Sequence, residues 1–334
     1  MFAARNSYRN RLAPVLAAAV VLGNVAVSNS ASGAGEDFGR WLEGVRSEAL
    51  DRGIKKTTVD EALTGVVQIP RVIELDRKQP EFTLTFQEYM SRVVPEKRVR
   101  KGRALIEKHQ VLLDAVAQKH GVQARFIVAL WGIESDFGRL TGGFKVVPAL
   151  ATLAFDGRRS SFFRSQLFHA LTILDQGHIS VDRMTGSWAG AMGQPQFMPS
   201  SFVSFATDHD GDGRIDIWTT PADVFGSAAN YLARSGWRDD LTWGRAVSVP
   251  KGFARSDFGL KTSKPLPQWQ QLGVRRVDGS DLPPRAVTAS VIEAEKGKGP
   301  TFVVYQNFRT ILKWNRSTFF ALAVGHLADR LDLR

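Results

Sequence analysis

The chain has 334 residues and a mass of 36.9 kDa, with 43% hydrophobic and 23% charged residues, which excludes wholesale disorder. It contains no cysteine, so disulfide frameworks, thiol catalysis and cysteine-ligated zinc or iron–sulfur sites are excluded. Lys and Arg number 44 against 33 Asp and Glu, which gives a formal net charge of +11.

The first residues have the three parts of a secretory signal peptide. Arg5, Arg9 and Arg11 precede an apolar run over 12–27, and small residues close it. The run is shorter than the roughly 20 residues of a membrane-spanning helix, although an uncleaved anchor is the alternative. We expect residues 1–28 to direct export to the periplasm. The exported protein is not expected to be a lipoprotein, because no cysteine is present to carry the lipid.

The exported body stays cationic. Removing residues 1–35 leaves 41 basic residues against 33 acidic ones, a net charge of +8, which favours a polyanionic partner. The basic cluster at 97–101 does not by itself indicate nucleic acid, because such a cluster is usually a solvated helix face. An anionic wall polymer or membrane surface fits an exported chain better, and no nucleic-acid partner is expected.

The N-terminal part reads as helical over 37–120. Residues 38, 41, 42 and 45 are apolar and recur at the spacing of one buried helix face. Pro70 and Pro80 predict an extended connection, because the residue before a proline avoids the helical region. Further helices are predicted over 82–90, 124–133, 162–174, 222–233 and 317–331.

Two segments lack helical periodicity. Residues 188–200 are rich in Gly, Met and Pro and predict an irregular loop. Residues 247–300 carry six of the 14 prolines and short β-favouring pieces, so we expect a small β-rich insert over 246–300. A β-like run at 301–305 and the last helix form a C-terminal piece, 301–334, which is expected to pack back on the preceding domain.

The sharpest local feature is a carboxylate near the end of the apolar helix. Phe126, Leu130 and Glu134 stand four residues apart and share one face. Desolvation there raises a carboxyl pKa and lets the group act as an acid near neutral pH. The alternative is a structural glutamate that caps the helix end or pairs with Arg139 there. Asp136 is expected to be structural, because residues two apart on a helix point to different faces.

A loop rich in small residues is the second candidate. Small residues around Met192 let the backbone approach a ligand, while Ser187, Gln194 and Gln196 offer neutral hydrogen-bonding groups. This mixture suits the hydroxyl and acetamide groups of a sugar. A tight loop that packs Met and Phe into the core explains the same residues equally well.

The segment 208–219 matches an EF-hand calcium loop at most ligand positions. Position 12 is the exception, because Thr219 stands where such loops carry a bidentate glutamate. A structural calcium site and a polar turn with Asx hydrogen bonds are both consistent with the pattern. The ligands would be Asp208, Asp210, Asp212, Arg214 through its backbone carbonyl, and Asp216.

Seven blocks along the chain are informative together. Two of them are Trp131-Gly-Ile-Glu-Ser-Asp-Phe-Gly138 and Ala189-Gly-Ala-Met-Gly-Gln-Pro-Gln-Phe-Met-Pro-Ser200. The others lie at 76–82, 155–159, 210–213, 228–232 and 307–315. In content and order they resemble the lytic murein transglycosylase B family, over about 38–330.

The resemblance implies a mainly α fold. A lysozyme-like catalytic core over 36–245 would carry an α-helical N-terminal lobe and the EF-hand-like loop, with the β-rich insert after it. The implied reaction is non-hydrolytic cleavage of the β-1,4 bond between N-acetylmuramic acid and N-acetylglucosamine in peptidoglycan, which leaves a 1,6-anhydro end. Glu134 would act first as general acid and then as general base. No cofactor is required beyond a structural calcium ion in the loop.

Site residues are also implied by position in the matching blocks. Arg158 and Arg159 would hold a peptide or lactyl carboxylate, Asn315 would contact a saccharide, and Tyr89 would line a subsite. The implied substrate-binding residues are Ser187, Gln196, Tyr231, Arg158, Arg159, Asn315, Met192 and Tyr89.

Two other functions stay open at this point. A true muramidase would use water and leave a reducing end. A non-catalytic peptidoglycan-binding protein would be expected to lack the acid, yet Glu134 is present. The expected partners are peptidoglycan glycan strands, together with proteins of cell-wall synthesis or division, and the chain is expected to be a monomer.

Overall fold

The computed structural model describes residues 34–78 and 84–332. Within these ranges the protein is mainly α-helical, as expected, with one two-stranded and one five-stranded β-sheet. The predicted signal peptide, residues 1–28, lies outside the described residues. In the described part of the chain, no helix combines the length and the apolar character needed to cross a membrane.

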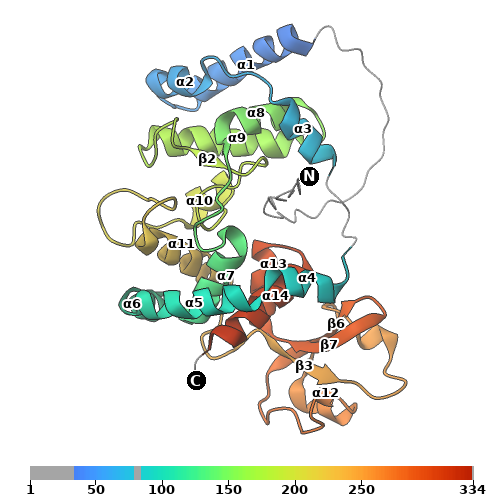
Figure 1. The fold of residues 1–334 in the computed structure, drawn as a ribbon. Coiled ribbons are helices and arrows are strands. Elements are labelled where there is room, and N and C mark those ends of the chain that lie inside the picture. The colour runs from blue at the N-terminus through green and yellow to red at the C-terminus, as the bar shows by residue number, and fades with distance from the viewer. Residues whose placement is uncertain (1–33, 79–83, 333–334) are drawn as a thin grey trace, which may run out of the picture.

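Three N-terminal helices cover a pair of apolar helices to form the N-terminal lobe (Figure 1). Phe38, Leu42 and Val45, on the predicted face of the first helix, are buried in one hydrophobic cluster with the apolar pair, here called the lobe cluster. Burying each such side chain contributes about 1.5–3 kcal/mol. The helices are α1 (Ala34–Asp51), α2 (Lys56–Leu63), α3 (Pro70–Arg77), α8 (Val146–Phe155) and α9 (Ser160–Asp175).

Two helix boundaries differ from the expectation. Pro70 begins α3 instead of extending the connection, because a proline at the first helical position needs no N–H partner and its fixed φ suits the helix. The helix predicted over 82–90 is α4 (Phe86–Val93). Thr85 and Glu88 set its start, because each side chain accepts a hydrogen bond from the other residue's backbone N–H. Pro80 lies outside the described residues.

The second half of the molecule is built around one helix, α7 (Ala124–Ser135), which matches the predicted apolar helix. Every residue over 126–131 is buried in a second hydrophobic cluster, here called the central cluster. Figure 1 shows α7 in the middle of the molecule, between the N-terminal lobe and the β-sheet. The surrounding helices are α5 (Glu96–Lys108), α6 (Gln110–His120), α11 (Pro221–Arg234) and α14 (Thr318–Leu331).

Some helices were not predicted from the sequence. The helix α8 is buried over most of its length, so its sequence shows no polar face and no 3.6-residue period. The other three are short, and short helices carry few periodic positions. They are α10 (Pro199–Phe205), α12 (Leu266–Gln271) and α13 (Gln306–Trp314).

The predicted β-rich part forms an antiparallel sheet in the order β4-β6-β7-β3-β5. In its centre Gly244 of β3 and Ser290 of β6 both lie opposite Val304 of β7. The inner strands β3 and β7, which pair with each other, run across the expected limits at 245/246 and 300/301. The strands are β3 (Gly244–Ser248), β4 (Lys264–Pro265), β5 (Arg275–Arg276), β6 (Thr288–Glu295) and β7 (Lys298–Val304).

One glycine controls how α14 meets this sheet. A Cβ atom placed on Gly325 would lie 2.5 Å from Cε2 of Trp243, whose indole is buried against the helix. We therefore expect Gly325→Ala to lower the free energy of unfolding by about 1–3 kcal/mol, measured by urea denaturation. Gly39→Ala is the matched control, because a Cβ at that exposed helical position meets nothing within 4 Å. Equal stabilities of the two variants would contradict this packing.

Candidate active site

The chain reverses sharply at the C-terminal end of α7, immediately after Glu134. Asp136, Phe137 and Gly138 all have left-handed backbone, with φ of 50°, 59° and 79°. Such φ values are rare for residues other than glycine, so surrounding contacts must hold the turn. Gly132 permits it, because a Cβ there would lie 2.7 Å from Cε1 of Phe137. The turn leaves Glu134 half-buried on the last turn of a helix that is buried over most of its length.

The neighbouring acid, Asp136, has a structural role, as predicted. Its carboxylate pairs with Arg139 at 2.6 Å, Arg98 at 3.7 Å and Lys101 at 3.9 Å. The alternative reading of Glu134, an ion pair with Arg139, is therefore wrong, because Asp136 takes that guanidinium. Within the described residues, no basic side chain forms an ion pair with Glu134.

Glu134 sits in apolar surroundings and has one hydrogen-bond partner among the described residues. Its Oε1 accepts a hydrogen bond from the indole N–H of Trp314 at 2.8 Å. Trp314 and Leu130 line a small apolar void on the same side of α7. Burial raises the pKa of Glu134 to about 8, and the hydrogen bond from Trp314 opposes this rise only in part. The half-buried carboxyl is therefore mostly protonated at neutral pH while solvent still reaches it.

Trp314 also ties the two hydrophobic clusters together at this point. Its ring centroid lies 4.7 Å from that of Tyr231 and 5.2 Å from that of Phe197. Both Trp314 and Tyr231 pack against the lobe cluster and the central cluster. The Tyr231 hydroxyl donates a hydrogen bond to the carbonyl of Lys313 at 2.8 Å. The structure thus brings Tyr231, one of the predicted site residues, next to the hydrogen-bond partner of Glu134.

Hydrogen bonds from side-chain amides tie the loop at 187–197 to the end of α7. The Oε1 of Gln194 accepts from the indole of Trp131, on α7, at 2.7 Å, and its Nε2 donates to the carbonyl of Trp218 at 2.8 Å. The Nε2 of Gln196 donates to the carbonyl of Thr141, just beyond α7, at 3.0 Å. Gln194 is therefore structural, because both ends of its amide are used inside the protein.

Gln196 and Ser187 each keep one hydrogen-bonding function unused. Gln196 is held at a φ of 53°, and its buried Oε1 has no hydrogen-bond partner among the described residues. An unpaired buried acceptor costs about 1–3 kcal/mol, which a ligand donor would recover. The buried Ser187 hydroxyl accepts from the backbone N–H of Ala191 at 3.0 Å, which leaves its own proton to donate.

Two predicted contacts lie in the interior. Met192 is fully buried in the lobe cluster, and its backbone N–H and carbonyl both bond to Phe197. Its side chain therefore packs into the core, as the alternative explanation of this loop has it, and a substrate contact at Met192 stays a prediction. Tyr89 is buried against Phe319. Burial raises the pKa of Tyr89 to about 12, and the charge of Glu134 adds to the rise.

The arginine pair lies at the junction of α8 and α9 and shares one buried acid. The Nε of Arg158 donates to Asp76 at 2.7 Å, and Arg159 also donates to that carboxylate. Burial alone would raise the pKa of Asp76, but the two guanidinium groups hold it below its ordinary value. Because one carboxylate faces two cations, the cluster keeps one excess positive charge.

Asn315 follows Trp314 at the C-terminal end of α13. Its Oδ1 accepts from the backbone N–H of Ser317 at 3.0 Å, which fixes the turn into α14. Because this bond uses the carbonyl oxygen, the amide NH₂ is the group left to meet a ligand.

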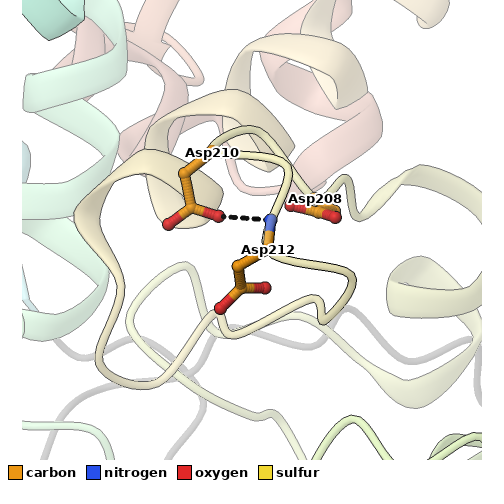
Figure 2. Close-up of side chains that lie close together, drawn as sticks. All are labelled: Asp208, Asp210 and Asp212. Atoms are coloured by element: carbon orange, nitrogen blue, oxygen red, sulfur yellow. Dashed lines mark hydrogen bonds between the residues drawn. The ribbon is translucent and has the colours of Figure 1, made fainter.

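The acidic loop brings three carboxylates together, as Figure 2 shows. Oxygen atoms of Asp208, Asp210 and Asp212 lie within 4.8 Å of one another. The backbone N–H groups of Gly213 and Gly211 hold the Asp208 carboxylate at 2.8 and 2.7 Å, and they lower its pKa. Three carboxylate oxygens at this spacing suit a hard divalent cation such as calcium.

The remaining loop positions bond to each other instead. Asp216 is buried and accepts from the backbone N–H groups of Trp218 and Thr219 at 2.9 and 2.8 Å, and also from the Thr219 hydroxyl. The Arg214 side chain lies 3.7 Å from Asp216. Asp223 of α11 accepts the N–H of Asp216 at 2.6 Å. The loop therefore fits a cation through its first three carboxylates, while positions 9 and 12 are engaged elsewhere.

Comparison with known proteins shows which family this chain belongs to. The family model of the transglycosylase SLT domain matches residues 37–329. The chain belongs to this family. A relative from Escherichia coli (strain K12), membrane-bound lytic murein transglycosylase B, is 29% identical over 304 residues, which cover 84% of this chain and 79% of the relative. The expected resemblance and a lytic transglycosylase activity are thereby confirmed.

Solved structures agree with the fold. SltB3 from Pseudomonas aeruginosa, in complex with NAG-anhNAM-pentapeptide, has a TM-score of 0.85 and 44% identity, over 87% of this chain and 78% of that chain. The Escherichia coli lytic transglycosylase Slt35 in complex with calcium has a TM-score of 0.75 and 28% identity, over 87% and 92% of the two chains. The lysozyme-like, mainly α architecture is thus confirmed.

Sequence reasoning missed two partners of the site. Trp314 lies 180 positions from Glu134, and a lone tryptophan gives no local signal of a long-range hydrogen bond. Asp76 showed no sign of being buried beneath two arginines, since its helix is short and polar. In both cases only the fold supplies the partner.

The raised pKa of Glu134 predicts how stability depends on pH. Between the ordinary value of 4.5 and about 8, the folded protein keeps this proton while the unfolded chain releases it. The contribution is fully present below pH 4.5 and is lost as pH rises through 8. We therefore expect Glu134→Gln to exceed the wild type in free energy of unfolding by roughly 1–4 kcal/mol at pH 9. Urea titrations at pH 5 and pH 9 measure this, and a pH-independent difference would count against the assignment.

Proposed function

We propose that the protein cleaves the β-1,4 bond between N-acetylmuramic acid and N-acetylglucosamine in peptidoglycan without water, and leaves a 1,6-anhydro end. The observation that carries this proposal is the single carboxyl of Glu134, protonated near neutral pH and paired with no base. Burial and Trp314 account for its shifted pKa, with no contribution from a second carboxylate of the described residues.

One carboxyl suffices if the substrate supplies its own nucleophile. Glu134 first gives its proton to the glycosidic oxygen, so that the bond to C1 breaks and the leaving sugar departs as an alcohol. The carboxylate then takes the proton of the C6 hydroxyl, whose oxygen bonds to C1 of the same sugar. Glu134 ends protonated, as it began. An intramolecular nucleophile removes the need to position a water molecule.

The surrounding groups suit a sugar with acetamide substituents. The unpaired Oε1 of Gln196 is an acceptor for an N–H or O–H, and the Ser187 hydroxyl is a donor. The rings of Tyr231 and Trp314 offer apolar surface beside the acid. Asn315 follows directly and has a free amide NH₂ for a saccharide oxygen. These groups would orient the sugar whose C1 reacts.

The excess positive charge of Arg158 and Arg159 suits a carboxylate on the peptide or lactyl part of the substrate. A relative, SltB3, is bound to a NAG-NAM-pentapeptide, which contains such groups. We further propose that the protein is exported to the periplasm by residues 1–28 and acts there on glycan strands as a monomer. Proteins of cell-wall synthesis or division are the macromolecular partners proposed with it.

A hydrolytic muramidase is the second candidate, and the products separate the two. We expect the purified protein to release muropeptides with 1,6-anhydro ends, as identified by mass spectrometry. We expect Glu134→Gln to lower the rate of release by about 10²-fold to 10⁴-fold, because the acid step and the base step both use this group. Glu107→Gln, which alters an exposed helical glutamate, is the control and should keep the activity. Reducing ends in the products would support hydrolysis, and full activity of Glu134→Gln would falsify the catalytic assignment.

We also propose that the loop at 208–219 binds calcium as a structural ion. The three clustered carboxylates of Asp208, Asp210 and Asp212 support it, and the relative Slt35 forms a complex with calcium. Thr219 at position 12 argues for weak affinity, because a neutral hydroxyl bonded to Asp216 replaces a bidentate carboxylate.

Changing position 12 tests this loop. We expect Thr219→Glu to raise calcium affinity at least tenfold and Asp210→Asn to lower it, as measured by calorimetric titration of calcium into chelator-treated protein. The melting temperature of the wild type should rise with added calcium. If calcium changes neither the heat signal nor the melting temperature in any of the three proteins, the loop is a polar turn.

A further inference from the structure

A second cavity lies apart from the acid, between the edge of the five-stranded sheet and the beginning of α13. Its volume is about 580 Å³, within the range of sites that bind small ligands. Its lining includes neither Glu134 nor any of the predicted site residues. The residues that matter for its chemistry are Arg238, Asp240, Ser263, Arg285, Gln306 and Arg309.

Three arginines and one acid give this lining an excess of positive charge. Asp240 is shared by Arg238, at 3.1 and 3.2 Å, and Arg285, at 3.0 Å. Both guanidinium side chains are more than half exposed, so these ion pairs are weak and leave donors open to the cavity. One carboxylate therefore balances only one of the two cations.

Arg309 is the third cation and has no acidic partner among the described residues. The two protons of one terminal nitrogen, Nη2, are shared among three acceptors, namely the carbonyl of Leu260 at 2.7 Å and the hydroxyls of Ser263 and Ser290 at 2.9 and 2.8 Å. These bonds fix the guanidinium plane and leave its Nε and Nη1 without a protein acceptor in the described part of the chain. A guanidinium that is held in place and still has N–H donors without an acceptor is suited to bidentate binding of an oxyanion.

The helix α13 connects this cavity with the proposed reaction site. Gln306 and Arg309 line the cavity in its first turns, and Trp314 at its other end donates to Glu134. Nine residues of α-helix span about 12–14 Å. A polymeric substrate can reach both ends of such a helix at once, whereas a single sugar cannot.

We propose that this cavity binds the carboxylate end of a peptide attached to the glycan, as a second point of contact away from the reacting bond. The proposal rests on the proposed function, because that substrate carries peptides. The recognition is by Arg309 and Arg285 as forked donors, with the Gln306 amide beside them. The shape of the cavity favours a peptide end over a bare anion, because an ion alone would fill little of 580 Å³.

The test is a binding measurement that needs no turnover. A fluorophore-labelled pentapeptide with a free C-terminal carboxylate is titrated with the full chain carrying Glu134→Gln, and fluorescence anisotropy gives Kd. We expect Kd to rise at least tenfold in Arg285→Gln/Arg309→Gln, and equally when the peptide ends in a carboxamide. Arg255→Gln, which removes an exposed cation paired with Glu293 outside the cavity, should leave Kd unchanged.

Further variants keep the outcome decisive. Ala286→Trp fills the cavity from an exposed position and leaves the Arg309 hydrogen bonds in place, so it should also abolish binding even if the double variant folds poorly. Arg158→Gln/Arg159→Gln removes the other proposed carboxylate site and should preserve this binding. The proposal is overturned if the carboxamide binds as well as the acid, if inorganic phosphate competes at equal concentration, or if only the Arg158 and Arg159 change weakens binding. None of these results depends on catalysis.

Discussion

The burial of one carboxyl between two hydrophobic clusters is the constraint on which the site depends. Glu134 lies where the lobe cluster and the central cluster meet at Trp314 and Tyr231. A carboxylate in such surroundings loses hydration, and a single indole N–H does not replace it. The proton therefore stays on the acid at neutral pH, which is the state that a general acid needs.

Contacts away from the Glu134 carboxyl hold the backbone that places this carboxyl in apolar surroundings. The α7 helix is buried along most of its length, and its end is locked by left-handed residues and by the ion pairs of Asp136. The side chain of Gln194 bonds the loop at 187–197 to Trp131, so Ser187 and Gln196 are positioned by the same helix that carries the acid. These contacts come from several elements and together fix where the acid and the loop at 187–197 lie.

Local sequence patterns predicted the elements that depend on residues close together in the sequence. The apolar face of α1 and the buried α7 follow from spacing alone, whereas the role expected of Glu134 and the expected reaction came from the family blocks. Patterns failed where distant residues decide the outcome: the Trp314 hydrogen bond and the shared use of Asp76 by two arginines. The helical start at Pro70 was missed for another reason, since proline fits both an extended connection and a first helical position.

The protonation state of Glu134 can be observed directly. Carbon-13 labelling of glutamate carboxyl groups, with the spectrum of Glu134→Gln subtracted, isolates its signal in a pH titration by nuclear magnetic resonance. This account predicts a midpoint at about pH 8. A midpoint near the ordinary value of 4.5 would show a solvated carboxylate at neutral pH, and the central claim of a protonated, desolvated acid would be wrong.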